Sequence, residues 1–221
     1  MRRRRAIEKA GAGAIPGAGQ ENFLRTVLCG VAAVLASSVC AFAAEDLAVD
    51  VARQGDGRIA VHAHAKLRAS RETVWRTLTD YGDFKRFVPG LDRSQVVSCA
   101  GGQCVVDQDW HLSILWFSLP IAVTVKSVER PPGALEVHLL KGDLKQLDGG
   151  YEIGQERDGQ IELRWEGTLE GPERLPGWLS AAFVRRMARE QFRGMVTEIE
   201  SRENSAEEGR RQSLKAPAAG P

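Results

Sequence analysis

The feature of this chain that most limits its possible fold is a long run of short strands that ends in one amphipathic helix. Between residues 95 and 169, Gly- and Pro-containing turn signals recur roughly every ten residues, as they do between antiparallel strands. The predicted strands are residues 95–99, 103–113, 120–130, 134–141, 147–156 and 160–169. A helix is predicted over residues 179–202, because one helical face gathers Phe183, Val184, Met187, Phe192, Met195, Val196 and Ile199.

The segment before these strands adds one more strand and two short helices. Residues 57–67 alternate between apolar and polar side chains, which predicts a half-buried strand. Ser70 is placed to cap a following helix, and residues 83–88 form a second short helix that ends at Pro89. Consecutive strands followed by a helix favour an α+β fold over an alternating α/β fold. We expect a curved antiparallel seven-stranded sheet wrapped around the long C-terminal helix.

The composition supports one folded domain. Residues 57–202 are expected to form it, after a lead-in over residues 44–56 and before a disordered tail over residues 203–221. Hydrophobic residues make up 43% of the chain and charged residues 27%, which excludes a polytopic membrane protein. The 30 basic and 29 acidic residues nearly balance, whereas nucleic-acid-binding proteins usually carry a basic excess. No nucleic-acid partner is therefore expected.

The N-terminal segment has the pattern of an export signal. Residues 1–43 hold six basic and two acidic residues, and residues 26–39 are a run of mostly apolar and small side chains. Ala41-Phe42-Ala43 then matches the small-x-small cleavage motif, so we expect a signal peptide cleaved between Ala43 and Ala44. The mature protein would be periplasmic or secreted. An uncleaved N-terminal anchor is the alternative, because the apolar stretch approaches the roughly 17 residues that can span a bilayer.

Two cysteines remain after the predicted cleavage. Cys99 and Cys104 flank Gly101-Gly102, a tight-turn signal that would place the two cysteines opposite each other across a hairpin. An exported protein is oxidised, so a Cys99–Cys104 disulfide is expected, with two free thiols as the alternative. No metal is expected here, because the sequence places no further ligands nearby.

A family resemblance enters with residues 69–91. This segment resembles the opening of the START-like, or helix-grip, superfamily, and in particular its polyketide cyclase/dehydrase and lipid-transport family, to which coenzyme Q-binding proteins belong. The residues that carry the resemblance are Val74, Trp75, Leu78, Asp80, Tyr81, Phe84, Phe87 and Pro89. It covers about residues 57–202 and also includes the segments 142–145 and 147–151. It implies a helix-grip fold with a mostly apolar cavity between the sheet and the C-terminal helix.

Strand alternation and this resemblance together predict the residues that would line such a cavity. The candidates are Phe84, Phe87, Val88, Gln108, Trp110, Tyr151, Trp165, Phe183 and Met187. The alternative is that these side chains only fill a solid core. With such a lining, the sequence favours an exported protein that binds or carries a lipid, isoprenoid quinone or polyketide-like molecule. We expect no cofactor and no covalent chemistry.

Two other functions stay open at this point. A cyclase or dehydratase would need a titratable group inside the cavity, and Gln108 and Tyr151 are the only polar residues predicted to face inward. No P-loop, G-x-G-x-x-G, H-E-x-x-H or G-x-S-x-G motif is present. An envelope interaction module would have a filled core. Trp116 and Phe117 would then form an exposed patch for a membrane or a partner.

The remaining chemically versatile residues are interpreted as surface or structural residues. His62 and His64 share a strand face with metal-ligand spacing, but the sequence places no third ligand beside them. Asp80 is expected to hold the Asp-Tyr-Gly turn. Solvent-facing positions are predicted for His111, His138, Asp107, Asp109, Arg185, Arg186 and Arg189.

Overall fold

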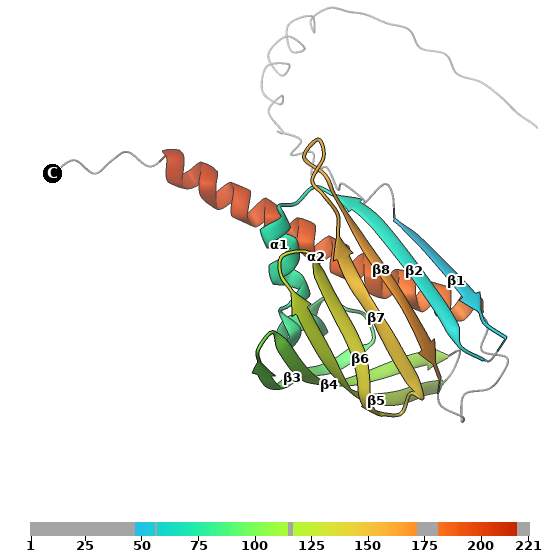
Figure 1. The fold of residues 1–221 in the computed structure, drawn as a ribbon. Helices are drawn as coiled ribbons and strands as arrows, with labels where there is room; N and C mark the ends of the chain where they lie inside the picture. Colours follow the sequence, from blue (N-terminus) through green and yellow to red (C-terminus); the bar gives the residue numbers. More distant parts are fainter. Residues whose placement is uncertain (1–46, 56, 115–116, 172–180, 216–221) are drawn as a thin grey trace, which may run out of the picture. The chain divides into compact units, whose positions relative to one another are not determined.

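A single curved antiparallel sheet dominates the part of the chain that the structure describes. The structure is a computed structural model that describes residues 47–55, 57–114, 117–171 and 181–215. Its strand order is β1-β2-β8-β7-β6-β5-β4-β3. The strands are β1 (Ala48–Arg53), β2 (Ile59–Leu67), β3 (Leu91–Ala100), β4 (Gln103–Ile114), β5 (Phe117–Arg130), β6 (Ala134–Gly142), β7 (Gln146–Ile153) and β8 (Ile161–Glu170). The sheet curls so that β4 and β5 lie across one end of it (Figure 1).

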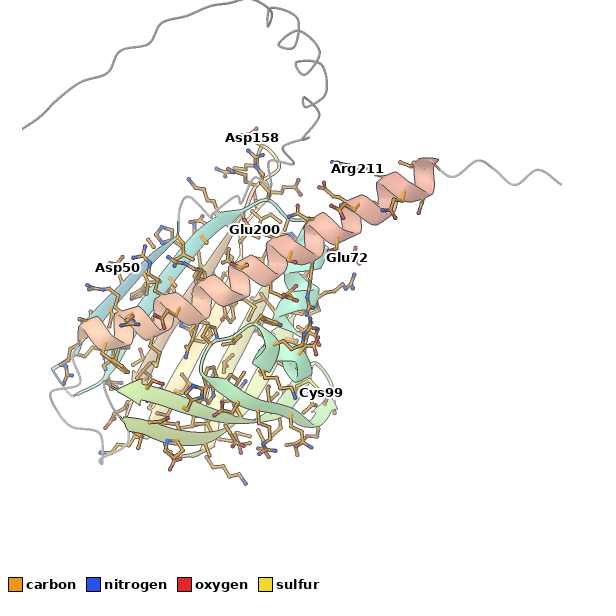
Figure 2. All side chains as sticks on the ribbon, turned by 180° about the vertical axis from the view of Figure 1, so that it is seen from behind. Asp50, Glu72, Cys99, Asp158, Glu200 and Arg211 are labelled. Atoms are coloured by element: carbon orange, nitrogen blue, oxygen red, sulfur yellow. A yellow bond between two sulfur atoms is a disulfide. The ribbon has the colours of Figure 1, made fainter. Side chains whose placement is uncertain are left out.

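Three helices complete the described fold. They are α1 (Arg71–Leu78), the 3-10 helix η1 (Tyr81–Arg86) and α2 (Ala181–Lys215). Figure 2 shows α2 running across the concave side of the sheet. The α+β helix-grip fold is therefore confirmed. In the described part of the chain, none of the helices has the length and apolar character that crossing a bilayer requires.

The sheet has eight strands, so the prediction of seven was wrong. The additional strand is β1, which lies in the segment expected to be only a lead-in and pairs antiparallel with β2. Val49 and Val51 are its buried side chains, and exposed Asp50 separates them. An edge strand this short gives too few alternating positions to be recognised without its neighbour.

The start of β5 also differs from the prediction. The predicted strands ended at residue 113 and resumed at residue 120, but Ser118 and Leu119 also belong to β5, and Pro120 pairs with His111 of β4. Trp116, half of the predicted membrane-contact patch, lies outside the described residues, as does the side chain of Phe117. The predicted signal segment with Cys29, Cys40 and the Ala43–Ala44 cleavage site also lies outside them.

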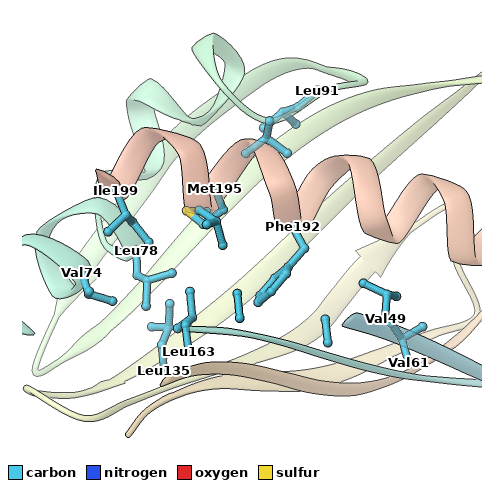
Figure 3. Close-up of a cluster of buried hydrophobic side chains, with 14 of the residues drawn as sticks. Val49, Val61, Val74, Leu78, Leu91, Leu135, Leu163, Phe192, Met195 and Ile199 are labelled. Atoms are coloured by element: carbon cyan, nitrogen blue, oxygen red, sulfur yellow. The ribbon is translucent and has the colours of Figure 1, made fainter. Parts of the chain in front are cut away.

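The core lies between α2 and the concave face of the sheet. Phe192, Met195 and Ile199 of α2 point toward the strands in Figure 3 and are almost fully buried. Ala63 and Ala65 of β2 are buried too, and their small side chains let the helix approach the sheet closely. The amphipathic stripe predicted from the sequence is thus the face that α2 buries.

Two contacts hold α1 against the rest of the fold. Its predicted N-cap is correct, because the Ser70 hydroxyl accepts a hydrogen bond from the Thr73 backbone N–H at 3.3 Å. Ser70 is in turn held by Glu203 of α2, whose Oε2 accepts from the Ser70 hydroxyl at 2.7 Å and from its backbone N–H at 3.0 Å. At the other side, Arg71 donates to the carbonyl oxygen of Ile153 at the end of β7.

Helix α2 continues to Lys215, so the prediction of a disordered tail from residue 203 was wrong at its start. Glu203 is anchored on α1, and Arg211 pairs with Glu207 one helical turn away at 3.3 Å. Pairs of opposite charge at this spacing stabilise a helix even where it has no apolar face. The Glu- and Arg-rich composition of residues 203–215 predicted disorder, but these residues form the last turns of α2.

The β3–β4 hairpin carries the predicted disulfide. Cys99 and Cys104 are directly opposite in the strand register, and their sulfur atoms are bonded. Strand β3 is also irregular, with register shifts between Leu91 and Arg93 and between Val96 and Ser98. These shifts interrupt the regular hydrogen-bonding ladder of an edge strand.

Candidate ligand-binding cavity

A cavity of about 200 Å³ lies between α2 and the concave face of the sheet. Its apolar wall consists of Val61, Ala63, Phe84, Val88, Val106, Trp110, Val125, Leu135, Val137, Leu147, Trp165, Leu169, Val184, Met187, Ala188, Phe192 and Met195. Its polar lining residues are Tyr81, Gln108, Ser127, Tyr151 and Gln191. The interior is therefore hollow at the place that the sequence predicted.

The structure brings seven of the nine predicted ligand-binding residues to this cavity. They are Phe84, Val88, Gln108, Trp110, Tyr151, Trp165 and Met187. The structure places these seven side chains in the cavity lining. That they contact a ligand stays a prediction. The strand residues among them were found by alternation, because every second side chain of a curved sheet faces its concave side.

Phe87 and Phe183 do not line the cavity. Phe87 ends η1, where its ring packs edge-on against Phe84 and lies under the Arg202 guanidinium, 5.5 Å from it. Phe183 is partly buried against the core one helical turn before Met187, on the same face of α2 but outside the cavity lining. Phe87 was predicted from the short helix expected at the cavity mouth, and Phe183 from the apolar stripe of the long helix. Neither pattern shows which apolar residues face a hollow and which pack against other side chains.

Two aromatic rings and two glycines shape the floor of the cavity. Tyr151 of β7 and Trp165 of β8 are register partners whose ring centroids lie 4.7 Å apart. The Trp165 indole leans over Gly149 and Gly167, so that a Cβ at Gly149 would lie 2.9 Å from its Cζ2 atom. Glycine at these positions leaves the space that the indole occupies.

At another point of the lining, the Tyr81 hydroxyl is already occupied. It donates a hydrogen bond to Glu129 Oε1 at 2.8 Å, and the Cys104 sulfur lies 3.5 Å from the same oxygen. Burial, together with this hydrogen bond and the Glu129 charge, raises the pKa of Tyr81 well above its usual value. Tyr81 is thus a neutral, structurally engaged group at neutral pH.

Three polar side chains of the lining are unengaged. Within the described part of the chain, Tyr151, Gln108 and Gln191 form no hydrogen bond with another residue. Burial raises the pKa of Tyr151 well above its usual value, so its hydroxyl stays protonated and able to donate. These groups are free to bind a polar atom of a ligand.

Sequence reasoning missed Tyr81, Ser127 and Gln191 as lining residues. Ser127 could have been found, because it continues the inward alternation of Val123 and Val125. Tyr81 was assigned to a helix-breaking turn, and its inward direction follows from the 3-10 helix that forms there. Gln191 is a polar residue beside the apolar stripe of α2, and no sequence signal distinguishes it from a surface glutamine.

The histidines considered as metal ligands, His62 and His64, do not line the cavity. His62 and His64 are exposed, and no group of three metal-ligating side chains occurs among the residues that the structure describes. His111 Nδ1 lies 2.8 Å from Asp92, and His138 Nδ1 lies 3.1 Å from Asp148. Asp107 accepts a hydrogen bond from Thr124, and Asp109 pairs with Arg93 at 2.6 Å.

Asp80 and the arginines of α2 join elements together. Asp80 was expected to hold the Asp-Tyr-Gly turn. Its backbone carbonyl accepts a hydrogen bond from the Asp83 N–H at 3.0 Å, while its side chain accepts one from Arg202 at 2.8 Å. Arg185 and Arg189 are exposed as predicted, yet each also donates to a backbone carbonyl oxygen at the edge of the sheet, those of Val51 and Leu47. These contacts fix α2 to η1 at one end and to the β1 edge at the other.

Comparison with known proteins agrees with this architecture. A family model described as polyketide cyclase / dehydrase and lipid transport matches residues 67–196. An aromatase/cyclase from a Streptomyces species has 15% identity and a TM-score of 0.55, over 66% of this chain and 95% of that one. A STAR-related lipid transfer protein from Xanthomonas axonopodis has 12% identity and a TM-score of 0.52, over 68% and 98%.

A third similar structure, a protein from Thermus thermophilus, has 16% identity and a TM-score of 0.56, over 66% of this chain and 98% of that one. No curated protein sequence matches this chain. At these identities the solved structures establish the fold and leave the ligand open.

Proposed function

Because the chain belongs to the polyketide cyclase / dehydrase and lipid transport family, we propose that it binds and carries a hydrophobic small molecule in the α2–sheet cavity without covalent chemistry. The observation that carries this proposal is a hollow, largely apolar interior whose lining contains no Asp, Glu, His, Lys, Arg or Cys among the described residues. Transfer of an apolar ligand into it would be favourable by about 25 cal/mol per Å² of buried apolar surface.

The enzymatic alternative has less support. Cyclisation or dehydration requires a group that accepts or donates a proton near neutral pH. The titratable side chains of the lining are Tyr81 and Tyr151, and burial raises the pKa of both above the usual value of a tyrosine. Both hydroxyls are thus poor bases. The Tyr81 hydroxyl already donates to Glu129, so Tyr151 is the tyrosine of the described lining that could orient a ligand oxygen.

We expect ligand binding to be lost when the cavity is filled and kept when the same side chain is added outside it. Ala188 of α2 lines the cavity, whereas Ala182 on the same helix is exposed. Ala188→Phe should therefore abolish binding of the molecule that co-purifies with the native protein, and Ala182→Phe should retain it. Native mass spectrometry of both variants gives the measurement, with thermal unfolding as the check that each variant folds. Equal ligand occupancy in the two variants would contradict the proposal.

The proposal extends to the compartment in which the protein works. A basic segment, an apolar run and Ala41-Phe42-Ala43 support export, and an oxidising compartment would maintain the Cys99–Cys104 disulfide. Expressed in a Gram-negative host, the chain should be recovered from the periplasm with Ala44 as its first residue. Intact-mass measurement tests this result. A chain that retains residues 1–43 in the membrane fraction would support the N-terminal anchor instead.

A further inference from the structure

We propose that the cavity selects an uncharged ring compound that carries a carbonyl oxygen, and that Tyr151 donates the hydrogen bond that recognises this oxygen. This inference rests on the proposed binding function and adds the chemical class of the ligand. It follows from three properties of the cavity: the charge of its lining, the state of its hydroxyl groups and its size.

The first property is the absence of compensating charge. No Lys, Arg or His belongs to the described lining. The ion pairs that Arg202 of α2 forms with Asp80 and Glu198 belong to a separate polar groove beside α1 and η1. A carboxylate or phosphate that entered the cavity would lose its hydration without gaining a counter-charge, which is strongly unfavourable in an apolar environment. An uncharged ligand avoids this loss.

The second property is the difference between the two tyrosines. The Tyr81 hydroxyl is held by Glu129, whereas the Tyr151 hydroxyl has no hydrogen-bond partner among the described residues. Trp165 packs against the Tyr151 ring and restricts its orientation. The Tyr151 hydroxyl lines the cavity without a protein partner, so a ligand that supplies an acceptor gains a hydrogen bond at little cost in ordering the protein. A carbonyl oxygen is such an acceptor.

The third property is size. At about 200 Å³ the cavity is smaller than the roughly 300–1,000 Å³ of typical sites for drug-sized ligands. Two acyl chains of a phospholipid would not fit into this volume, whereas a compound of one or two rings is compatible with it. Gln108 and Gln191 could then orient a second polar atom of the ring compound, because an amide both donates and accepts.

Three naphthalene derivatives of nearly equal shape separate these effects. 2-Acetylnaphthalene is neutral and has a carbonyl oxygen, 2-ethylnaphthalene is neutral without an acceptor oxygen, and 2-naphthoate carries a charge. Their binding to the purified full chain would be measured by calorimetry at pH 7.5, for the native protein and for Tyr151→Phe. Since the Tyr151 hydroxyl has no partner to lose, this variant should fold normally, and thermal unfolding checks that it does.

We expect the native protein to bind 2-acetylnaphthalene at least tenfold more tightly than 2-naphthoate. Tyr151→Phe should weaken 2-acetylnaphthalene about fivefold, as expected for one hydrogen bond, and change 2-ethylnaphthalene less than twofold. Binding of 2-ethylnaphthalene with no effect of Tyr151→Phe on 2-acetylnaphthalene, or tighter binding of 2-naphthoate, would overturn this inference alone. Failure of all three compounds to bind would overturn this inference, and the proposed function would fall with it if the native protein also retained no co-purifying molecule.

Discussion

Replacing Gly194 with alanine should destabilise the protein by about 2–4 kcal/mol, although alanine is the better helix former. Gly194 lies where α2 passes over the loop that follows η1. A Cβ at this position would overlap the carbonyl oxygen of Phe87 and lie 2.9 Å from Pro89 Cδ. Because a backbone carbonyl cannot move as a flexible side chain does, either α2 or the loop must shift. The shift would also disturb Phe84 and Val88, which line the cavity from the same segment.

Gly209 offers a matched control on the same helix. It belongs to the exposed C-terminal part of α2, and a Cβ there would have no atom within 4 Å. Gly209→Ala should therefore stabilise the protein, by at most about 1 kcal/mol, through helix propensity alone. Urea unfolding of the two variants measures both effects. Stabilisation by Gly194→Ala as well would show that α2 does not approach the Phe87–Pro89 loop as closely as described.

Removal of the Glu203 carboxylate should cost about 3 kcal/mol of unfolding free energy. The side chain is only 8% exposed and accepts hydrogen bonds from the Ser70 hydroxyl and backbone N–H and from Arg210. Burial alone would raise the pKa of Glu203, but hydrogen bonds from Thr73, Ser70 and Arg210 outweigh it and lower this pKa to about 2. Glu203→Ala would lose these bonds and leave the first turn of α1 without its partner on α2.

The same carboxylate predicts a pH dependence with a definite sign. Its pKa is lower in the folded state than the ordinary 4.5, so its contribution is fully present above about pH 4.5 and is lost as the pH falls toward 2. In Glu203→Gln this loss should be absent, and the variant should differ from the native protein most at neutral pH. Urea unfolding between pH 2.5 and 7 gives the comparison.

Glu207→Ala is the control for Glu203, because Glu207 is an exposed residue of the same helix that pairs only with Arg211 among the described residues. This variant should change stability by less than about 0.5 kcal/mol at any of these pH values. If Glu203→Ala were equally mild, the contact between α2 and the N-terminus of α1 would not contribute as the geometry indicates.

The parts of the fold that could be predicted from sequence are those that depend on local periodicity. The Ser70 cap, the alternation of Ile161, Leu163 and Trp165, and the hairpin that pairs Cys99 with Cys104 are all encoded within about ten residues. Strand β1 was missed because its buried pair, Val49 and Val51, becomes meaningful only when β2 lies beside it.

The site was predictable to the extent that strand alternation determines direction. Gln108, Trp110, Tyr151 and Trp165 were placed correctly for this reason. On α2 the apolar stripe is longer than the cavity, so the position of the helix along the sheet decides that Met187 lines the cavity and Phe183, one turn earlier on the same face, does not. That position depends on long-range contacts such as Gly194 against Phe87, which no local pattern reveals.

The register shifts in β3 have a consequence for how the protein behaves at high concentration. Strand β3 is the last in the sheet order, so one of its edges has no neighbouring strand to pair its backbone groups. Val96 and Val97 are exposed on this strand and add apolar surface. A regular edge strand with these properties can pair with strands of other molecules and lead to fibrous aggregation. The bulges at Asp92 and Val97 disrupt the regular hydrogen-bond spacing that an incoming strand would need. We therefore expect these bulges to prevent edge-to-edge pairing between molecules.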